Sequence, residues 1–125
     1  MTDPPAQRWR LHLGGSLLAA RKDRDATRIA ALRSALSAID NAETPDGTQI
    51  DAGPAETIAG SVAGLGAAEV ARRELSDGQI RDLLQSEIDE RCSAAEKIIA
   101  GGHAERAAAL RSEAAILADL LSGRP

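Results

Sequence analysis

Aromatic residues are almost absent from this chain of 125 residues, which has one tryptophan and no phenylalanine or tyrosine. A core without large rings cannot fill wide spaces, so the elements around it must approach closely. About one residue in five is alanine, which favours helices. Sandwiches and barrels, in contrast, are typical of sequences rich in β-branched and aromatic residues. The composition therefore predicts an all-α protein.

Cysteine and long apolar runs are also scarce. Cys92 is the only cysteine, so the chain cannot form an internal disulfide, which is typical of an intracellular protein. No stretch of the sequence approaches the ~20 apolar residues of a membrane span. We therefore expect a cytoplasmic protein with no membrane partner.

Positive charge is in deficit overall but is unevenly distributed. The formal net charge is −4, which opposes nucleic-acid binding through the field of the whole chain. Residues 1–43 carry seven basic and five acidic residues, which leaves +2 there and −6 in the remainder. The basic residues at the turn of the first predicted hairpin are the candidate RNA contacts, although no Phe or Tyr accompanies them to stack bases. A solvated helix surface is the favoured interpretation of these residues, with RNA contact as the alternative; they are Arg21, Lys22, Arg24 and Arg28.

The first part of the chain predicts two helices joined by a short polar link. The first covers about residues 8–22, with Trp9, Leu13, Leu17 and Ala20 facing inward, and the glycines at 14 and 15 predict a kink there or a start only at Ser16. The second covers residues 25–43, because its apolar residues recur every three or four positions. The apolar stripe of this second helix consists of Ile29, Leu32, Leu36 and Ile39, which leaves Arg28, Arg33, Asp40 and Glu43 largely on other faces.

Residues 44–66 lack helical periodicity and are dense in glycine and proline, which predicts a long loop. A short helix is expected over residues 67–74. At Ser76, a serine followed three residues later by Gln79 predicts the start of a third main helix, which ends at Gly101 and Gly102. The fourth helix covers about residues 104–121. The inward stripes of these two helices are Ile80, Leu84, Ile88, Cys92, Ala95 and Ile99, and then Leu110, Ala114, Leu117 and Leu121.

The sequence thus predicts a single domain over residues 1–125, built as a small bundle of about four helices. Two helical hairpins, at 7–43 and 76–121, are joined by a long loop with a short helix at 44–75.

No catalytic, cofactor or metal site is predicted. His12 and His103 are far apart in sequence, and neither has a second ligand at metal spacing. We expect Cys92, on an apolar stripe, to act as a small hydrophobe. The helical glutamates, including Glu87 and Glu113, are expected on a solvated face. The glycine-rich residues 59–66 lack the lysine of a phosphate-binding loop.

Several residues match the signature of a known family. In the second helix the pattern is Leu-Arg, then Ala-Ile, then Asn and Glu, and further on come a Glu and an Arg four apart, a glycine turn and an Ala-Glu helix. The chain resembles the GatB/YqeY family at these positions, which are Leu32, Arg33, Ala38, Ile39, Asn41, Glu43, Glu87, Arg91, Gly102, Ala107, Glu113, Ile116, Leu117 and Leu121. It departs from the family pattern at His103, Leu120 and Ser122, where Arg, Tyr and Pro are usual.

The resemblance implies a relation to the tail of the B subunit of the tRNA-dependent amidotransferase, a carbon–nitrogen ligase with glutamine as amide donor, and to small free-standing proteins. It implies tRNA, or a protein related to amidotransferases or aminoacyl-tRNA, as partner, and an accessory role without catalysis. In such proteins a second helical subdomain follows, and we expect this chain to lack it. A protein-interaction scaffold unrelated to tRNA is the alternative function. An enzyme is less favoured because no acid, base or nucleophile is positioned.

Overall fold

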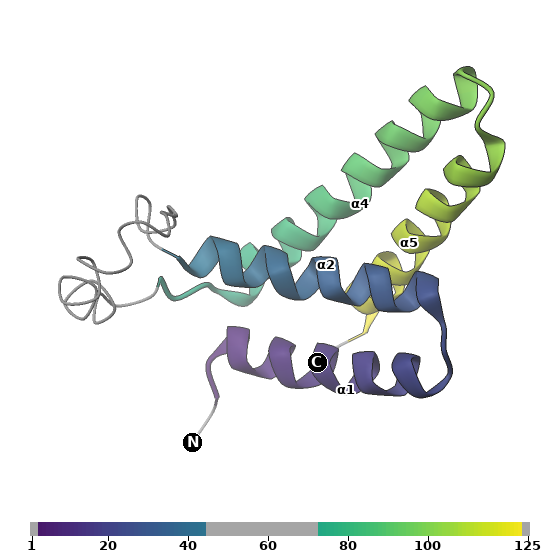
Figure 1. Cartoon of the computed structure of the whole chain (residues 1–125). Coiled ribbons are helices and arrows are strands. Elements are labelled where there is room, and N and C mark those ends of the chain that lie inside the picture. Colours follow the sequence, from purple (N-terminus) through teal and green to yellow (C-terminus); the bar gives the residue numbers. More distant parts are fainter. Residues whose placement is uncertain (1–2, 45–72, 124–125) are drawn as a thin grey trace, which may run out of the picture.

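The structure, a computed structural model, describes residues 3–44 and 73–123. These residues form four α-helices, α1 (Pro5–Lys22), α2 (Ala26–Glu43), α4 (Asp77–Ala100) and α5 (Ala104–Ser122), and none of them lies in a strand. α1 runs antiparallel to α2, and α4 to α5, so there are two helical hairpins (Figure 1). The prediction of a small all-α bundle is confirmed. No helix in the described ranges is both long and apolar enough to cross a membrane.

The core lies around α2, which contacts the other three helices. Alanines at 20, 31 and 35 are fully buried and let the helix backbones approach closely. Burying each Leu or Ile side chain contributes about 1.5–3 kcal/mol, so a few such residues dominate the packing energy. The largest fully buried side chains are Trp9, Leu13, Leu32, Ile39, Ile80, Leu84 and Leu117.

The first helix is longer than predicted. It begins at Pro5 rather than at about Arg8, because a proline at the first helical position lacks only an amide that would have no partner there. It then continues through Gly14 and Gly15, so a start at Ser16 is wrong. Each glycine costs the helix about 1 kcal/mol relative to alanine. The packing of Trp9 and Leu13 against the core outweighs that cost.

The ends of α4 agree with the prediction. The backbone N–H of Gln79 donates to the Ser76 hydroxyl at 3.0 Å, and the Gln79 side chain accepts from the Ser76 N–H at 2.8 Å. This reciprocal pair satisfies two amides at the helix start. At the other end Gly101 caps the helix, and Gly102 has a φ of 90°, a conformation that other residues rarely adopt.

The predicted inward faces of the second hairpin need correction. Cys92 is exposed, and Ile99 is 42% exposed, so neither belongs to the core. The reason is that the hairpin extends beyond α2, as Figure 1 shows, and there only α5 covers α4. In α5 the buried residues include Ala107 and Leu120, which the predicted stripe omitted.

Other predictions concern residues 45–72, which lie outside the described part of the chain. These include most of the predicted loop and residues 67–72 of the short helix. Arg73 and Glu74, at the end of that predicted helix, are described and are not helical.

A polar contact joins the two hairpins at the buried tryptophan. The indole N–H of Trp9 donates to the carboxylate of Asp77 at 2.8 Å. Arg81 donates to the same carboxylate at 2.7 Å and lies 5.3 Å from the centroid of the indole ring. Arg81 also donates to the carbonyl of Leu121 at 2.8 Å. These contacts therefore hold together the starts of α1 and α4 and the end of α5.

Candidate nucleic-acid interface

The candidate cations lie at the turn between α1 and α2. The helix α1 ends in a motif in which the N–H of Arg24 donates to the Arg21 carbonyl at 3.1 Å and that of Asp25 to the Ala20 carbonyl at 3.0 Å. Glycine usually occupies the position of Arg24, since its φ of 56° is in the left-handed region. Asp25 then caps α2 by accepting from the Arg28 N–H at 3.1 Å.

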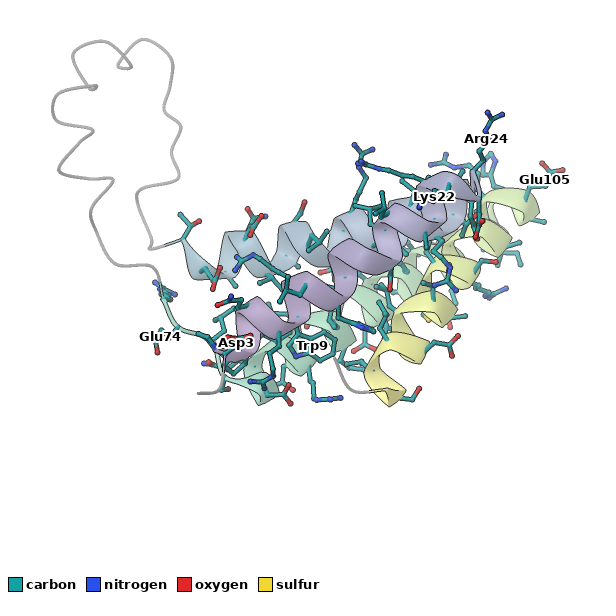
Figure 2. The ribbon with its side chains drawn as sticks, turned by 90° about the horizontal axis from the view of Figure 1, so that it is seen from below. Asp3, Trp9, Lys22, Arg24, Glu74 and Glu105 are labelled. Carbon is teal, nitrogen blue, oxygen red and sulfur yellow. The ribbon has the colours of Figure 1, made fainter. Side chains whose placement is uncertain are left out.

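The structure brings the four predicted cations to one end of the first hairpin. Arg21, Lys22 and Arg24 are exposed, and Figure 2 shows Lys22 and Arg24 at the end of the bundle opposite Trp9. Arg28 is half-buried, and its guanidinium lies 3.9 Å from the Asp25 carboxylate. Arg21 and Lys22 also occupy the last turn of α1, where cations interact favourably with the helix dipole. The site therefore consists of three exposed cations and a fourth beside the Asp25 carboxylate, with the exposed Asp23 between Lys22 and Arg24 in the same turn.

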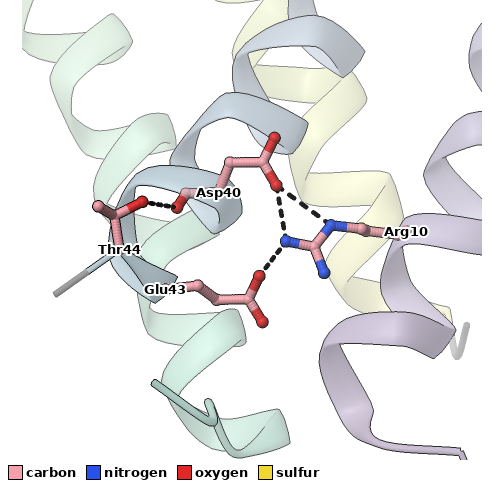
Figure 3. Close-up of polar contacts among 4 residues, drawn as sticks. All are labelled: Arg10, Asp40, Glu43 and Thr44. Atoms are coloured by element: carbon pink, nitrogen blue, oxygen red, sulfur yellow. Dashed lines mark hydrogen bonds and ion pairs between the residues drawn. The ribbon is translucent and has the colours of Figure 1, made fainter. Parts of the chain in front are cut away.

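Glu43, one of the residues that match the family signature, was predicted to lie away from the apolar stripe of α2. It is buried instead, so this prediction is wrong. Its carboxylate pairs with Arg10 of α1, as Figure 3 shows, and Arg10 also binds Asp40 at 2.6 Å. The hydrogen bond from Arg10 to Glu43 is the largest of the effects that raise the pKa of Arg10, and Asp40 adds to it. The two carboxylates fix α1 against the last turns of α2, so these residues have a structural role.

A second ion-pair cluster joins α4 to α5. Arg91 donates to Glu87 at 2.8 Å and to Glu113 at 2.9 Å. Burial opposes the charge of Arg91, but the hydrogen bonds to the two carboxylates outweigh it and raise its pKa. The side chains of Glu87 and Glu113 are only 23% and 20% exposed, so the expectation of a solvated face was wrong for them.

The remaining family-motif residues divide between core and surface. Leu32 and Ile39 are fully buried, whereas Arg33 and Asn41 are exposed. The residues that the resemblance rests on are thus mostly packing and ion-pair residues, which serve the fold.

The described part of the chain offers little support for a metal site or for an acid–base active site. There, no group of three or more His, Cys, Asp or Glu side chains could hold a metal ion. His103 precedes α5 in an exposed turn. The carboxylates of the two clusters are bound to arginines, so neither pair is arranged as a general acid and base.

Comparison of the chain with protein-family models, with curated proteins and with solved structures finds no match. The relation to the GatB/YqeY family stays a prediction from the residues named above.

Proposed function

We propose that this chain is a non-catalytic helical module related to the amidotransferase tail, and that it binds RNA through the turn between α1 and α2. In this role it would assist glutamine-dependent carbon–nitrogen ligation in the cytoplasm by contacting tRNA or a tRNA-related protein. The observation that supports the proposal is the exposure of Arg21, Lys22 and Arg24 at one end of a hairpin. Exposed cations at one end of a rigid element can contact neighbouring phosphates.

The conformation of Arg24 adds to this support. A residue other than glycine in the left-handed region costs roughly 1–2 kcal/mol, so the fold alone would favour glycine there. The arginine holds a cation at the tip of the turn despite that cost. Strained positions of this kind are enriched at functional sites.

The charge and composition of the chain set the kind of binding expected. Outside residues 1–43 the net charge is −6, which repels phosphate and leaves the turn as the point of contact. Without Phe or Tyr the module cannot stack bases on aromatic rings there. We therefore expect weak binding through phosphates with little sequence preference.

Titration of labelled tRNA with the full chain tests this proposal. With about two to four phosphate contacts, raising salt from about 50 to about 200 mM should weaken binding by about tenfold to about 150-fold. Absence of binding at tens of micromolar protein in low salt would remove the RNA proposal.

Two variants of the turn make the test specific. The double variant Arg24→Glu/Arg28→Glu should abolish binding while the helix content is kept, because residue 24 lies outside both helices and residue 28 lies in the first turn of α2, where glutamate is favourable. Arg24→Gly should weaken binding and raise the melting temperature, so that loss of binding cannot be attributed to unfolding. The matched control reverses two exposed arginines of α5, Arg106 and Arg111, and should retain most of the binding. Equal losses in both double variants would mean that net charge alone is responsible.

The alternative function is a protein-interaction module unrelated to tRNA. It is favoured by an exposed apolar face on α1, because Leu11 and Leu18 are 65% and 57% exposed.

A further inference from the structure

The face of α1 that points away from the bundle is apolar at its centre. Leu11 and Leu18 are seven residues apart and therefore lie on the same side of the helix. Among the described residues they are the two most exposed large hydrophobic side chains. Gly14 and Gly15 lie between them, and both are exposed. We call this set of four residues the outer face of α1.

Nothing inside the described fold explains the two glycines. Apart from its chain neighbours and the backbone of the helix itself, a Cβ atom built at Gly14 or at Gly15 would meet no described atom within 4 Å. Their φ values are ordinary, so the helix backbone does not require glycine at either position. Glycine is the poorest helix former after proline, and alanine would suit the helix better. What the glycines provide is a surface that another backbone can approach closely.

Within α1 itself, the charges beside the outer face have one sign. α1 contains no Asp or Glu, and three of its four cations stand at the two ends of the face, whereas Arg10 pairs with Asp40 and Glu43 of α2. Arg8 lies one turn before Leu11, is half-buried and donates to the Asp3 carbonyl at 2.6 Å, and the exposed Arg21 and Lys22 lie one turn after Leu18. The carboxylates of Asp3 and Asp23 stand just outside the helix ends. A partner lying along the face would therefore meet leucines and glycines at its centre and cations at both ends.

We propose that the outer face of α1 is a docking site for an amphipathic helix of another protein that carries carboxylates beside its apolar stripe. The glycines admit the backbone or a large side chain of that helix between Leu11 and Leu18, as in helix-in-groove recognition. The carboxylates pair with Arg8, Arg21 and Lys22 at the rim, which selects an acidic partner over a basic one. This inference does not depend on RNA binding.

The same observations disfavour other occupants. A second copy of α1 would place cations against cations in either orientation, for example Arg8 opposite Arg21 when the helices are antiparallel. An anionic membrane would use the cations, but it needs a broader apolar face than two leucines, and Trp9 is fully buried on the opposite side.

The test uses a display library of amphipathic helical peptides of about 18 residues, in which the apolar stripe is fixed and the flanking positions vary among Glu, Gln and Lys. Selection on the full-length protein should enrich Glu at the flanks. A labelled peptide from that selection should bind at least about tenfold more tightly than its Lys counterpart. Enrichment of Lys, or no enrichment, would overturn the proposal.

Variants of α1 locate the binding. Gly14→Ala/Gly15→Ala should raise the melting temperature and yet weaken peptide binding, which separates docking from folding. Leu18→Asp should abolish binding, because it places a carboxylate against the acidic peptide. The control Arg106→Glu/Arg111→Glu makes the same change in net charge on α5, away from the outer face, and should bind the peptide within about twofold of the wild type. Gly14→Ala/Gly15→Ala keeps the four cations of the turn and should retain RNA binding under the earlier proposal, so the two proposals can fail separately. Peptide binding indifferent to both α1 variants would exclude this face.

Three measurements cover the other occupants, and each positive result would overturn the proposal. Sedimentation of the wild type would reveal a dimer that Leu18→Asp dissolves. Vesicles of phosphatidylcholine and phosphatidylserine would bind the wild type but not Leu18→Asp. Peptide binding that appears only after residues 45–72 are replaced with a short Gly/Ser linker would identify that segment as the occupant.

Discussion

The contact between Trp9 and Asp77 offers a direct test of how the two hairpins are held together. Trp9 is fully buried, and its indole N–H donates to the Asp77 carboxylate at 2.8 Å. Replacing Asp77 with alanine removes the acceptor, and an unsatisfied buried donor costs about 1–3 kcal/mol. Because the Asp77 side chain is 41% exposed, water can reach part of the vacated space. We therefore expect Asp77→Ala to lower the free energy of unfolding by about 1–2 kcal/mol.

Two further variants separate the hydrogen bond from the charge. Asp77→Asn keeps an oxygen that can accept from Trp9. It loses the ion pair with Arg81, which at such exposure contributes about 0.3–0.5 kcal/mol, and the negative charge in the first turn of α4. It should therefore destabilise the protein less than Asp77→Ala does. The matched control is Asp82→Ala, an exposed aspartate on the same helix, which should change stability by less than about 0.5 kcal/mol.

Urea denaturation followed by tryptophan fluorescence measures all three variants. Trp9 is the only tryptophan, so the emission reports on the junction itself. If Asp77→Ala unfolds at the same urea concentration as Asp82→Ala, the contact does not stabilise the fold. If Asp77→Asn is as damaging as Asp77→Ala, the charge rather than the hydrogen bond is responsible.

The same junction predicts a dependence on pH. The hydrogen bond from Trp9, followed by that from Arg81, holds the pKa of Asp77 below its ordinary value. The folded state therefore binds this proton less readily than the unfolded state. The stabilisation is present above the ordinary pKa of about 4 and is lost as the pH falls through the lower folded value. The stability difference between the wild type and Asp77→Asn should shrink below about pH 4, and a constant difference from pH 7 to pH 2 would contradict this account.

Two other predictions concern packing and ion pairs. Leu36→Asp should cost about 2–4 kcal/mol, because Leu36 is half-buried against the core, whereas the exposed Arg33→Ala should cost less than about 0.5 kcal/mol; similar melting temperatures would refute this. Arg91→Met should cost about 2–3 kcal/mol, since it leaves Glu87 and Glu113 without their shared cation, whereas Glu87→Gln should cost only about 1 kcal/mol. If urea denaturation shows that Arg91→Met and Glu87→Gln lower the free energy of unfolding equally, Arg91 does not relieve repulsion between the carboxylates.

Features that depend on neighbouring residues in the chain could be predicted from the sequence. The start of α4 is an example, because Ser76 and Gln79 satisfy each other's backbone amides within one turn. The inward face of α2 is another, since Leu32 and Ile39 lie on the predicted stripe and are fully buried. The exposure of Lys22 and Arg24 likewise follows from the tightness of the turn that carries them.

Features that depend on a distant partner could not be predicted in the same way. Helical periodicity gives the side of α2 on which Glu43 lies. It does not reveal that Arg10 of α1 pairs with the Glu43 carboxylate and so offsets the cost of burying that charge. The exposure of Cys92 has the converse cause, because its apolar stripe continues past the point where α2 covers α4. The outer face of α1 is also a feature that depends on a distant partner. Leu11 and Leu18 carry an apolar surface that no described part of this chain covers, and the cations beside them favour an acidic helix as its partner.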